Sequence, residues 1–234
     1  MRFSSRASRR GFLAGVFGVA AAAAGGRVAA VAAQGGHDGW IKEVPGTKRC
    51  FFDFPRHMNG FGLVHIFNYL NTYAAAYGGK PGQMGAVGTF YGIGPGASIA
   101  MGFNDAMWAK YALGEYHGLK DAAGRPYTRN PFHRPTKADA ALLFQQVQSP
   151  RLAPFEDVMV ASGIESLQKQ GTKFLMCANA LGAWALELAA RGKGEAGAIE
   201  PDLRANLLPG VTIVPAMVVA IEQAQAAGIA YNRQ

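Results

Sequence analysis

The sequence predicts an α/β fold, a doubly wound and mainly parallel sheet with helices on both faces. Short apolar segments of strand length alternate with longer segments whose apolar residues recur at helical spacing, and glycine or proline separates the two kinds. Strands that alternate with helices form parallel sheets, and their right-handed crossovers place helices on either face.

The chain supplies these segments in a regular order. Strands are expected close to residues 49–54, 84–91, 174–177, 211–214 and 229–231. Helices are expected at about 60–77, around 103–115, and at 156–170, 178–190 and 215–228, with Pro215 in the first turn of the last one. Residues 117–154 interrupt the alternation because they are rich in proline and arginine. Only 137–148, with Thr136 as N-cap, has a helical pattern there.

Residues 1–33 are predicted to be a twin-arginine export signal. Ser8-Arg9-Arg10-Gly11-Phe12-Leu13 precedes a mild apolar run, and small residues before Gln34 offer cleavage sites. The run is too short and too rich in glycine to span a bilayer comfortably. We therefore expect cleavage, a periplasmic protein, and no stable membrane insertion after the signal is removed.

Without the signal, the charge of the chain is modest. Five of the 23 basic residues and none of the 15 acidic residues lie in 1–33, so the rest has 18 basic and 15 acidic side chains, a net charge of +3. No basic stripe remains, so no nucleic-acid partner is expected. We expect residues 34–48 to be a loose N-terminus. Residues 49–234 should form one α/β domain, with 117–154 as an excursion too polar for its own core.

The stretch 171–184 holds the first candidate site. The apolar segment 174–176 stops at Cys177, and helical spacing begins directly afterwards with Leu181 and Trp184. Cys177 is therefore expected at the carboxyl end of a strand and beside the first turn of a helix. Ligands gather at that edge of open parallel sheets, and a helix N-terminus favours an anion. Two interpretations stay open, a nucleophilic thiol or a small buried hydrophobic residue.

Cys50 is the other cysteine of the chain, near the start of the first strand and toward the opposite end of the sheet. A disulfide needs Cα atoms within about 7 Å, so we expect none and predict a buried thiol at Cys50. The sequence has no Cys-x-x-Cys pair, and a dithiol redox role is not expected.

A glycine-rich turn, Gly92-Ile93-Gly94-Pro95-Gly96-Ala97, has the pattern of a dinucleotide-binding turn. That pattern normally follows the first strand of the unit and precedes an acidic residue at the end of the next strand. Here it follows the second strand, and the acid at the required distance, Glu115, falls in a helix. We interpret it as a turn that requires glycine and expect no cofactor. Gly92, Gly94 and Asn179 are expected to line the same cleft as Cys177.

The histidines show no metal-ligand spacing such as His-x-x-x-His. His57, directly after the first strand, is best placed near the cleft, as a base or an anion partner. His65 falls on the polar stripe of its helix and is expected to be solvated. A metal site would require distant histidines to converge.

A series of motifs follows in the last third of the chain. They are a helix ending in Leu167-Gln-Lys-Gln-Gly171, a strand ending in Cys177, the helix start Ala178-Asn-Ala-Leu-Gly, then Leu208-Pro-Gly-Val211-Thr-Ile-Val-Pro and Gln225-Ala-Ala-Gly228-Ile-Ala-Tyr231. In this order they resemble the DsrE/DsrF-like family of sulfur-trafficking proteins, in an exported variant. Residues 49–116 match that family only in the order of their elements. The resemblance implies a small α/β sandwich that oligomerises. It also implies that the cysteine at position 177 accepts sulfur and passes it on as a persulfide.

Three functions stay open. The first is a periplasmic protein that handles sulfur through Cys177, as a persulfide carrier or a sulfurtransferase-like enzyme. It would form a homo-oligomer and have a protein sulfur donor or acceptor as partner. The second is a non-enzymatic oligomeric binding or accessory protein of the same fold with a buried Cys177. The third is an enzyme loaded with a metal or cofactor before export.

Overall fold

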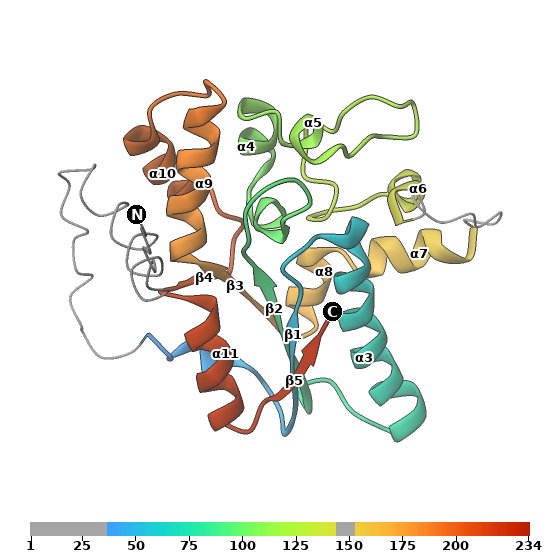
Figure 1. Cartoon of the computed structure of the whole chain (residues 1–234). Helices are drawn as coiled ribbons and strands as arrows, with labels where there is room; N and C mark the ends of the chain where they lie inside the picture. Colours follow the sequence, from blue (N-terminus) through green and yellow to red (C-terminus); the bar gives the residue numbers. More distant parts are fainter. Residues whose placement is uncertain (1–36, 144–152) are drawn as a thin grey trace, which may run out of the picture. The chain divides into compact units, whose positions relative to one another are not determined.

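The computed structural model of the chain describes residues 37–143 and 153–234, and the expected export signal lies outside the described residues. Within them, five strands form one parallel sheet in the order β4-β3-β2-β1-β5, which confirms the predicted doubly wound α/β fold (Figure 1). The strands are β1 (Lys48–Asp53), β2 (Met84–Phe90), β3 (Thr172–Cys177), β4 (Val211–Val214) and β5 (Ala230–Arg233).

Helices join these strands and cover the sheet. α3 (Phe61–Tyr77) follows the short η1 (Met58–Gly60) and leads from β1 to β2, and α11 (Met217–Ala226) leads from β4 to β5. β3 continues directly into α9 (Ala178–Ala190), and α10 (Ala196–Ala205) follows before β4. The remaining elements are α2 (Trp40–Glu43) before β1 and, between β2 and β3, η2 (Ser98–Gly102), α4 (Asp105–Lys110), α5 (Leu113–His117), η3 (Lys137–Asp139), α6 (Ala140–Leu143), α7 (Ala153–Ala161) and α8 (Ile164–Lys169).

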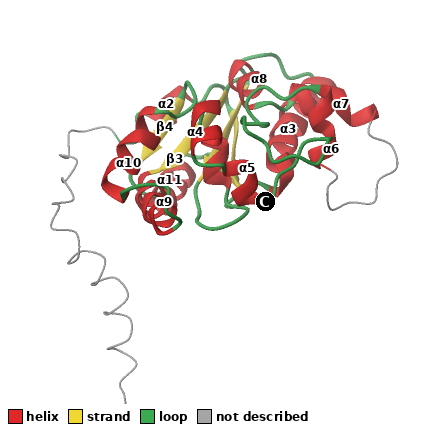
Figure 2. Ribbon diagram, turned by 90° about the horizontal axis from the view of Figure 1, so that it is seen from above, coloured by secondary structure: helices red, strands yellow, loops and turns green. Residues whose placement is uncertain are grey.

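One face of the sheet packs against most of these helices. Phe52 of β1, Phe90 of β2 and Phe174 of β3 belong to one buried cluster with apolar residues of α3, α4, α8, α9 and α10. The rings of Phe90 and Phe174 are stacked in parallel with centroids 5.0 Å apart. Figure 2 shows the strands, in yellow, surrounded by helices.

The opposite face is covered by α11 and the short α2. Side chains alternate between the two faces along a strand, so the neighbours of the residues above point this way. The buried residues of this second cluster are Trp40, Val44, Phe51, Val87, Leu175, Cys177, Val214, Met217, Ala220, Ala224 and Ile229. Cys177 and Cys50 therefore lie on opposite faces of the sheet.

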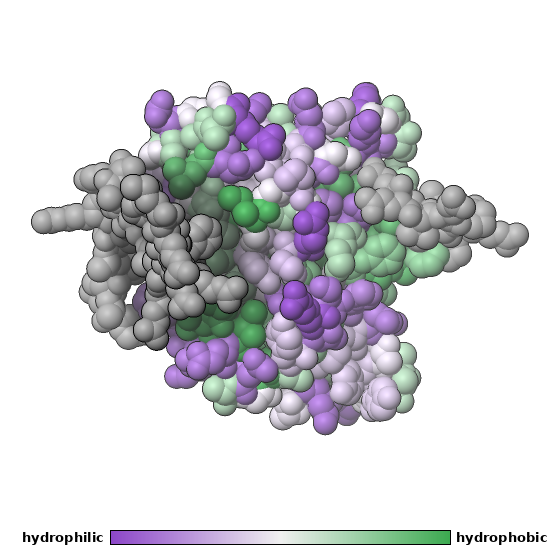
Figure 3. Space-filling model, viewed as in Figure 1, coloured by the Kyte–Doolittle hydropathy of each residue, from purple (hydrophilic) through white to green (hydrophobic). Residues whose placement is uncertain are grey.

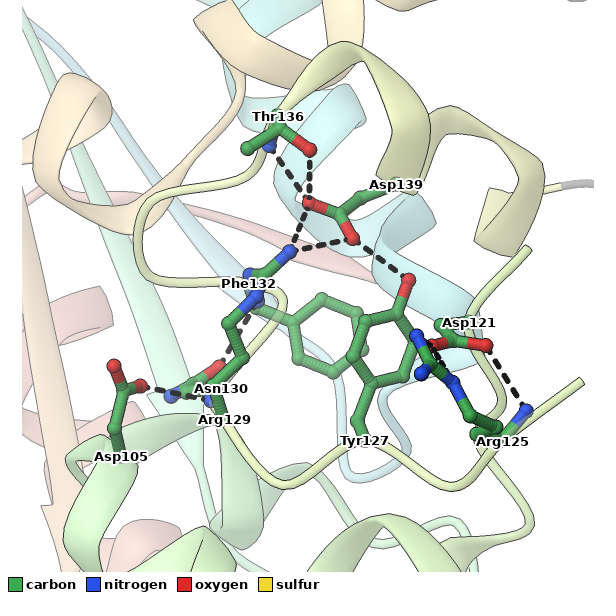
Figure 4. A network of polar contacts seen from close by, with 9 residues as sticks. All are labelled: Asp105, Asp121, Arg125, Tyr127, Arg129, Asn130, Phe132, Thr136 and Asp139. Carbon is green, nitrogen blue, oxygen red and sulfur yellow. Dashed lines mark hydrogen bonds and ion pairs between the residues drawn. The ribbon is translucent and has the colours of Figure 1, made fainter. Parts of the chain in front are cut away.

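A polar network fixes the long connection between β2 and β3 (Figure 4). The buried Asp139 accepts hydrogen bonds from the Tyr127 hydroxyl at 2.7 Å, from Arg129 at 2.6 Å, and from the amide and hydroxyl of Thr136 at 2.7 and 2.8 Å. Burial acts to raise the pKa of Asp139, but these hydrogen bonds outweigh it and hold the pKa below its ordinary value. Thr136 is the N-cap, as predicted. Residues 144–148 of the predicted helix lie outside the described residues.

Backbone breaks divide two of the predicted helices. The helix predicted around 103–115 is divided into α4, which ends at Lys110, and α5, which follows Ala112. The φ of Ala112, 53°, is left-handed and cannot continue a helix. The helix predicted over 156–170 is α7 and α8, interrupted at Ser162 and Gly163.

Two further differences concern α11 and α10, the last two helices of the chain. The last helix begins at Met217, so Pro215 lies before it rather than in its first turn. α10 was not predicted because Pro201 lies inside it and only two of its residues, Ile199 and Leu203, are buried. No helix among the described residues is long and apolar enough to cross a membrane.

Candidate functional site

Cys177 is the last residue of β3 and the N-cap residue of α9, as the sequence predicts. Its φ of −79° and ψ of 119° are extended, so the chain changes from strand to helix at this residue. The side chain lies in the cluster beneath α11 and only 6% of the residue is exposed. Cys177 thus has the position of a reactive thiol. Its burial means that only small reagents can reach it.

A buried carboxylate lies on the same face of the sheet, at the end of β1. Asp53 accepts hydrogen bonds from the Tyr91 hydroxyl at 2.6 Å and from the Tyr231 hydroxyl at 2.7 Å. Phe90 pairs with Met176, so Tyr91 leaves β2 beside Cys177 and reaches across to β1. Burial, and then the hydrogen bond to Asp53, raises the pKa of Tyr91, so this hydroxyl keeps its proton.

Cys50 lies apart from this edge. Its side chain points to the opposite face, and burial raises its pKa to about 11. Both cysteines are free, which agrees with the prediction of a buried thiol and no disulfide. Thiol chemistry in this protein therefore depends on Cys177.

His57 and His117 come together from distant parts of the chain. Their rings are in edge-to-face contact with centroids 5.5 Å apart, and the ring of His117 also stacks on Trp184 of α9 at 5.4 Å. Nδ1 of His57 accepts the amide of Asn59, and Nδ1 of His117 accepts the amide of Gly96, each at 3.0 Å. The two Nε2 atoms and the Trp184 Nε1 atom are buried and have no hydrogen-bond partner among the described residues. An unsatisfied buried donor costs about 1–3 kcal/mol.

Burial keeps both imidazoles neutral. It lowers the pKa of His57 to about 4 and that of His117 to about 3, and the positive charge of Arg56 adds to both shifts. Because Nδ1 of each neutral ring accepts a hydrogen bond, the single ring proton is assigned to Nε2. This geometry suits the anion-partner interpretation of His57 better than the base interpretation.

The glycine-rich turn after β2 packs against this histidine pair. Gly92, Gly94 and Gly96 have φ values of 89°, 86° and 86°, as expected of a turn that requires glycine. The Gly96 carbonyl accepts the His57 amide at 2.8 Å, and the Pro95 carbonyl accepts a hydrogen bond from Arg56 at 3.1 Å. The sequence analysis placed this turn beside Cys177, whereas its hydrogen bonds in the structure include those to Arg56, His57 and His117.

The chain after His57 has an unusual backbone. Met58 and Asn59 have positive φ values of 42° and 53°, and Gly60 follows with 98°. Non-glycine residues in this region carry conformational strain, which tends to occur at functional sites.

The other predicted residues lie at the surface. Asn179 is exposed in the first turn of α9, and His65 is exposed on α3, as predicted. In the described part of the chain, no group of three or more His, Cys, Asp or Glu side chains is arranged to hold a metal ion.

Two grooves lie away from Cys177 and from the pair of His57 and His117. A groove of about 510 Å³ between α3 and β5 is lined by a row of tyrosines, Tyr69, Tyr73 and Tyr77, and by polar residues that include Asn68 and Asn232. A groove of about 610 Å³ lies beside the network of Asp139. Neither is lined by Cys177 or by the histidine pair.

The sequence analysis did not single out Asp53, Tyr91 or His117 as site residues. Asp53 carried a usable signal, because a carboxylate that ends an apolar strand is placed at the ligand-binding edge of a parallel sheet. His117 carried none, because its contact with His57 depends on how the connection between β2 and β3 folds back.

The comparisons with known proteins add no family. The chain matches no protein-family model, no curated protein and no solved structure. The resemblance to DsrE/DsrF-like proteins therefore stays a prediction from the sequence, beside a fold that agrees with it.

Proposed function

We propose that the protein handles sulfur through Cys177, as a carrier or transferase that holds the sulfur as a persulfide. The observation that supports this proposal is the position of Cys177, which ends β3 and is the N-cap of the 13-residue helix α9. The unpaired amides and the dipole of a helix N-terminus stabilise an anionic sulfur, whether thiolate or persulfide.

The proposed chemistry needs only one cysteine. The Cys177 thiolate attacks the outer sulfur of thiosulfate, a bond forms between the two sulfur atoms, and the bond to the sulfonate sulfur breaks. Sulfite leaves with the electron pair of that bond, and the negative charge stays on the outer sulfur of the persulfide. A polysulfide reacts in the same way and leaves one sulfur shorter. In the transfer step, a second thiolate attacks the outer sulfur of the persulfide, and the Cys177 thiolate leaves with the electron pair of the broken bond.

The setting proposed for this chemistry follows the sequence. The protein is exported by the twin-arginine route, acts in the periplasm as a homo-oligomer, and exchanges sulfur with a protein donor or acceptor. Exposed apolar side chains on α11, Val218 and Val219, support an interface between copies.

The burial of Cys177 supports the alternative function. At 6% exposure the residue is as well covered as a structural cysteine, and Met217 and Val214 belong to the same apolar cluster. In that case the protein is a non-enzymatic, oligomeric binding or accessory protein, and Cys177 serves only as a packed residue of the apolar core.

Incubation with thiosulfate or polysulfide, followed by mass spectrometry of the peptides, tests the proposal. We expect a mass increase of one sulfur on the peptide that contains Cys177 and none on the peptide that contains Cys50, because burial raises the pKa of Cys50 to about 11. Cys50→Ser should label like the wild type. Equal labelling of Cys177→Ser and wild type would refute the proposal, and an unlabelled wild type would favour the alternative.

A further inference from the structure

Three buried rings lie in contact, and among the described residues their N–H groups have no acceptor. His57 is 7% exposed, His117 is 9% exposed and Trp184 is fully buried. Their rings touch in sequence, His57 against His117 and His117 against Trp184. Native proteins satisfy most of their buried donors, so a cluster of unsatisfied donors at the carboxyl edge of a parallel sheet indicates a bound acceptor.

The hydrogen bonds at Nδ1 determine which kind of ligand suits this cluster. A histidine that binds a metal through Nε2 usually donates a proton from Nδ1 to a second partner. Here each Nδ1 accepts a backbone amide instead, so Nε2 carries the proton and has no lone pair for a metal. Both Nε2 groups can only donate, which calls for an oxygen acceptor.

Arg56 supplies a positive charge next to the two donors. Its guanidinium lies over Gly96, where an added Cβ would come within 2.5 Å of Nη2, and Gly96 is the residue whose amide holds His117. In the described ranges Arg56 forms one hydrogen bond, to the Pro95 carbonyl, and no ion pair with a carboxylate. An unpaired guanidinium beside neutral N–H donors favours an anion over a neutral acceptor.

We infer that His57 and His117 form the donor pair of a binding site for a small oxyanion, with Arg56 balancing its charge. Both Nε2 atoms are shielded from solvent, so we expect an anion of a few atoms rather than a nucleotide. The ring of Trp184 fixes the orientation of His117 by stacking, and the left-handed backbone at Met58 and Asn59 places the amide that fixes His57.

This site is separate from the one proposed for sulfur. The Trp184 side chain lies in the cluster on one face of the sheet, and Cys177 lies in the cluster on the other. Loss of oxyanion binding should therefore leave persulfide formation at Cys177 unchanged, so the two proposals can fail independently.

Titration of the full chain with inorganic phosphate tests the inference. In ¹⁵N-resolved spectra of the histidine rings we expect both Nε2 positions to be protonated at pH 7 and both to shift in a saturable manner with phosphate. Sodium chloride at the same ionic strength should leave the chemical shifts of both Nε2 positions unchanged. Nε2–H signals that do not respond to phosphate or to sulfate would show that no oxyanion binds there and would overturn the inference.

Variants provide an independent test by thermal unfolding. Because a ligand that binds only the folded state raises Tm, phosphate should raise the wild-type Tm by roughly a few degrees. His117→Phe keeps a ring that can stack on Trp184 and removes the donor, and His57→Phe does the same for the other ring, so both should lose this shift. His65→Phe is the matched control, because His65 is exposed on α3, and should keep it. An equal shift in all variants would mean an adventitious ion only.

Discussion

The burial of His57 and His117 makes the stability of the protein depend on pH. Each ring is held neutral in the folded state, with a pKa lowered to about 4 or about 3 mainly by burial. In the unfolded chain a histidine has a pKa of about 6.5. Between these values the unfolded state binds more protons than the folded state, so stability decreases as the pH falls below about 6.5.

We therefore expect the free energy of unfolding to decrease between pH 6.5 and pH 4.5, approaching about 1.4 kcal/mol per pH unit for each histidine. Urea denaturation at several pH values measures this dependence of the free energy of unfolding on pH. His117→Phe should show a smaller slope than the wild type, because one of the histidines with a lowered pKa is gone. The exposed His65 provides the control, and His65→Phe should keep the wild-type slope. A wild-type slope in His117→Phe would contradict this account.

At the scale of residues, the sequence predicted where a residue lies in a strand or helix better than it predicted what surrounds its side chain. The change from strand to helix at Cys177 followed from the spacing of apolar residues, and the structure has it at that residue. The burial of Cys177 did not follow, because it depends on α11, which packs from a distant part of the chain. The contact between His57 and His117 could not be predicted either, because it also joins distant parts of the chain.

At the scale of elements, Asp139 determines how the connection between β2 and β3 is held. It is the shared acceptor of Tyr127, Arg129 and Thr136, and an asparagine in its place would lose the charge and turn an amide toward donors. We expect Asp139→Asn to lower the free energy of unfolding by about 2–3 kcal/mol, less than for a fully buried ion pair because the Arg129 side chain is 38% exposed.

Asp121 offers a matched control for Asp139. It lies in the same connection and pairs with Arg125, but that arginine is 77% exposed and the pair is screened by solvent. Asp121→Asn should leave the midpoint of urea denaturation close to that of the wild type. Equal destabilisation by the two substitutions would show that the network of Asp139 does not hold this connection.

The elements themselves were predicted where their apolar pattern is continuous. α9 and β4 have the bounds expected from the sequence, and α3 ends at Tyr77, directly before Gly78, whose φ is 65°. α10 escaped prediction because a proline interrupts a short and largely exposed helix. The division at Ala112 had no local signal, since alanine favours helix and adopts a left-handed conformation only when its surroundings impose it.

At the scale of the whole molecule, α11 is the surface best suited to contact another copy. Figure 3 shows hydrophobic side chains, in green, over the upper end of this helix, and Val218 and Val219 are 73% and 48% exposed. Exposed apolar residues on one helix are typical of an interface. The proposed homo-oligomer should therefore use α11.

Light scattering coupled to gel filtration measures the mass of the protein in solution, and so tests the proposed homo-oligomer. We expect a wild-type mass of more than one chain, and a shift toward the monomer for Val218→Glu, because a buried charge at the interface is costly. Val160→Glu on α7 is the control, since Val160 is 38% exposed on a different helix. A monomeric wild type, or an equal effect of both substitutions, would contradict an interface at α11.

The fold class was predictable as a whole because a parallel sheet leaves a repeated pattern along the chain, whereas the site depends on contacts between segments far apart in sequence. Asp53 meets Tyr231 across 178 positions, and no local pattern records such a contact. The account of function thus depends most on whether Cys177 can react in the folded protein.

The rate at which a small alkylating reagent modifies the two cysteines in the native protein tests this claim most directly. Cys50 serves as an internal reference, because burial raises its pKa to about 11. The account predicts that Cys177 is alkylated in the folded protein at least about tenfold faster than Cys50, and at a rate unrelated to global unfolding. Modification of both cysteines only after unfolding, at the same rate, would contradict it.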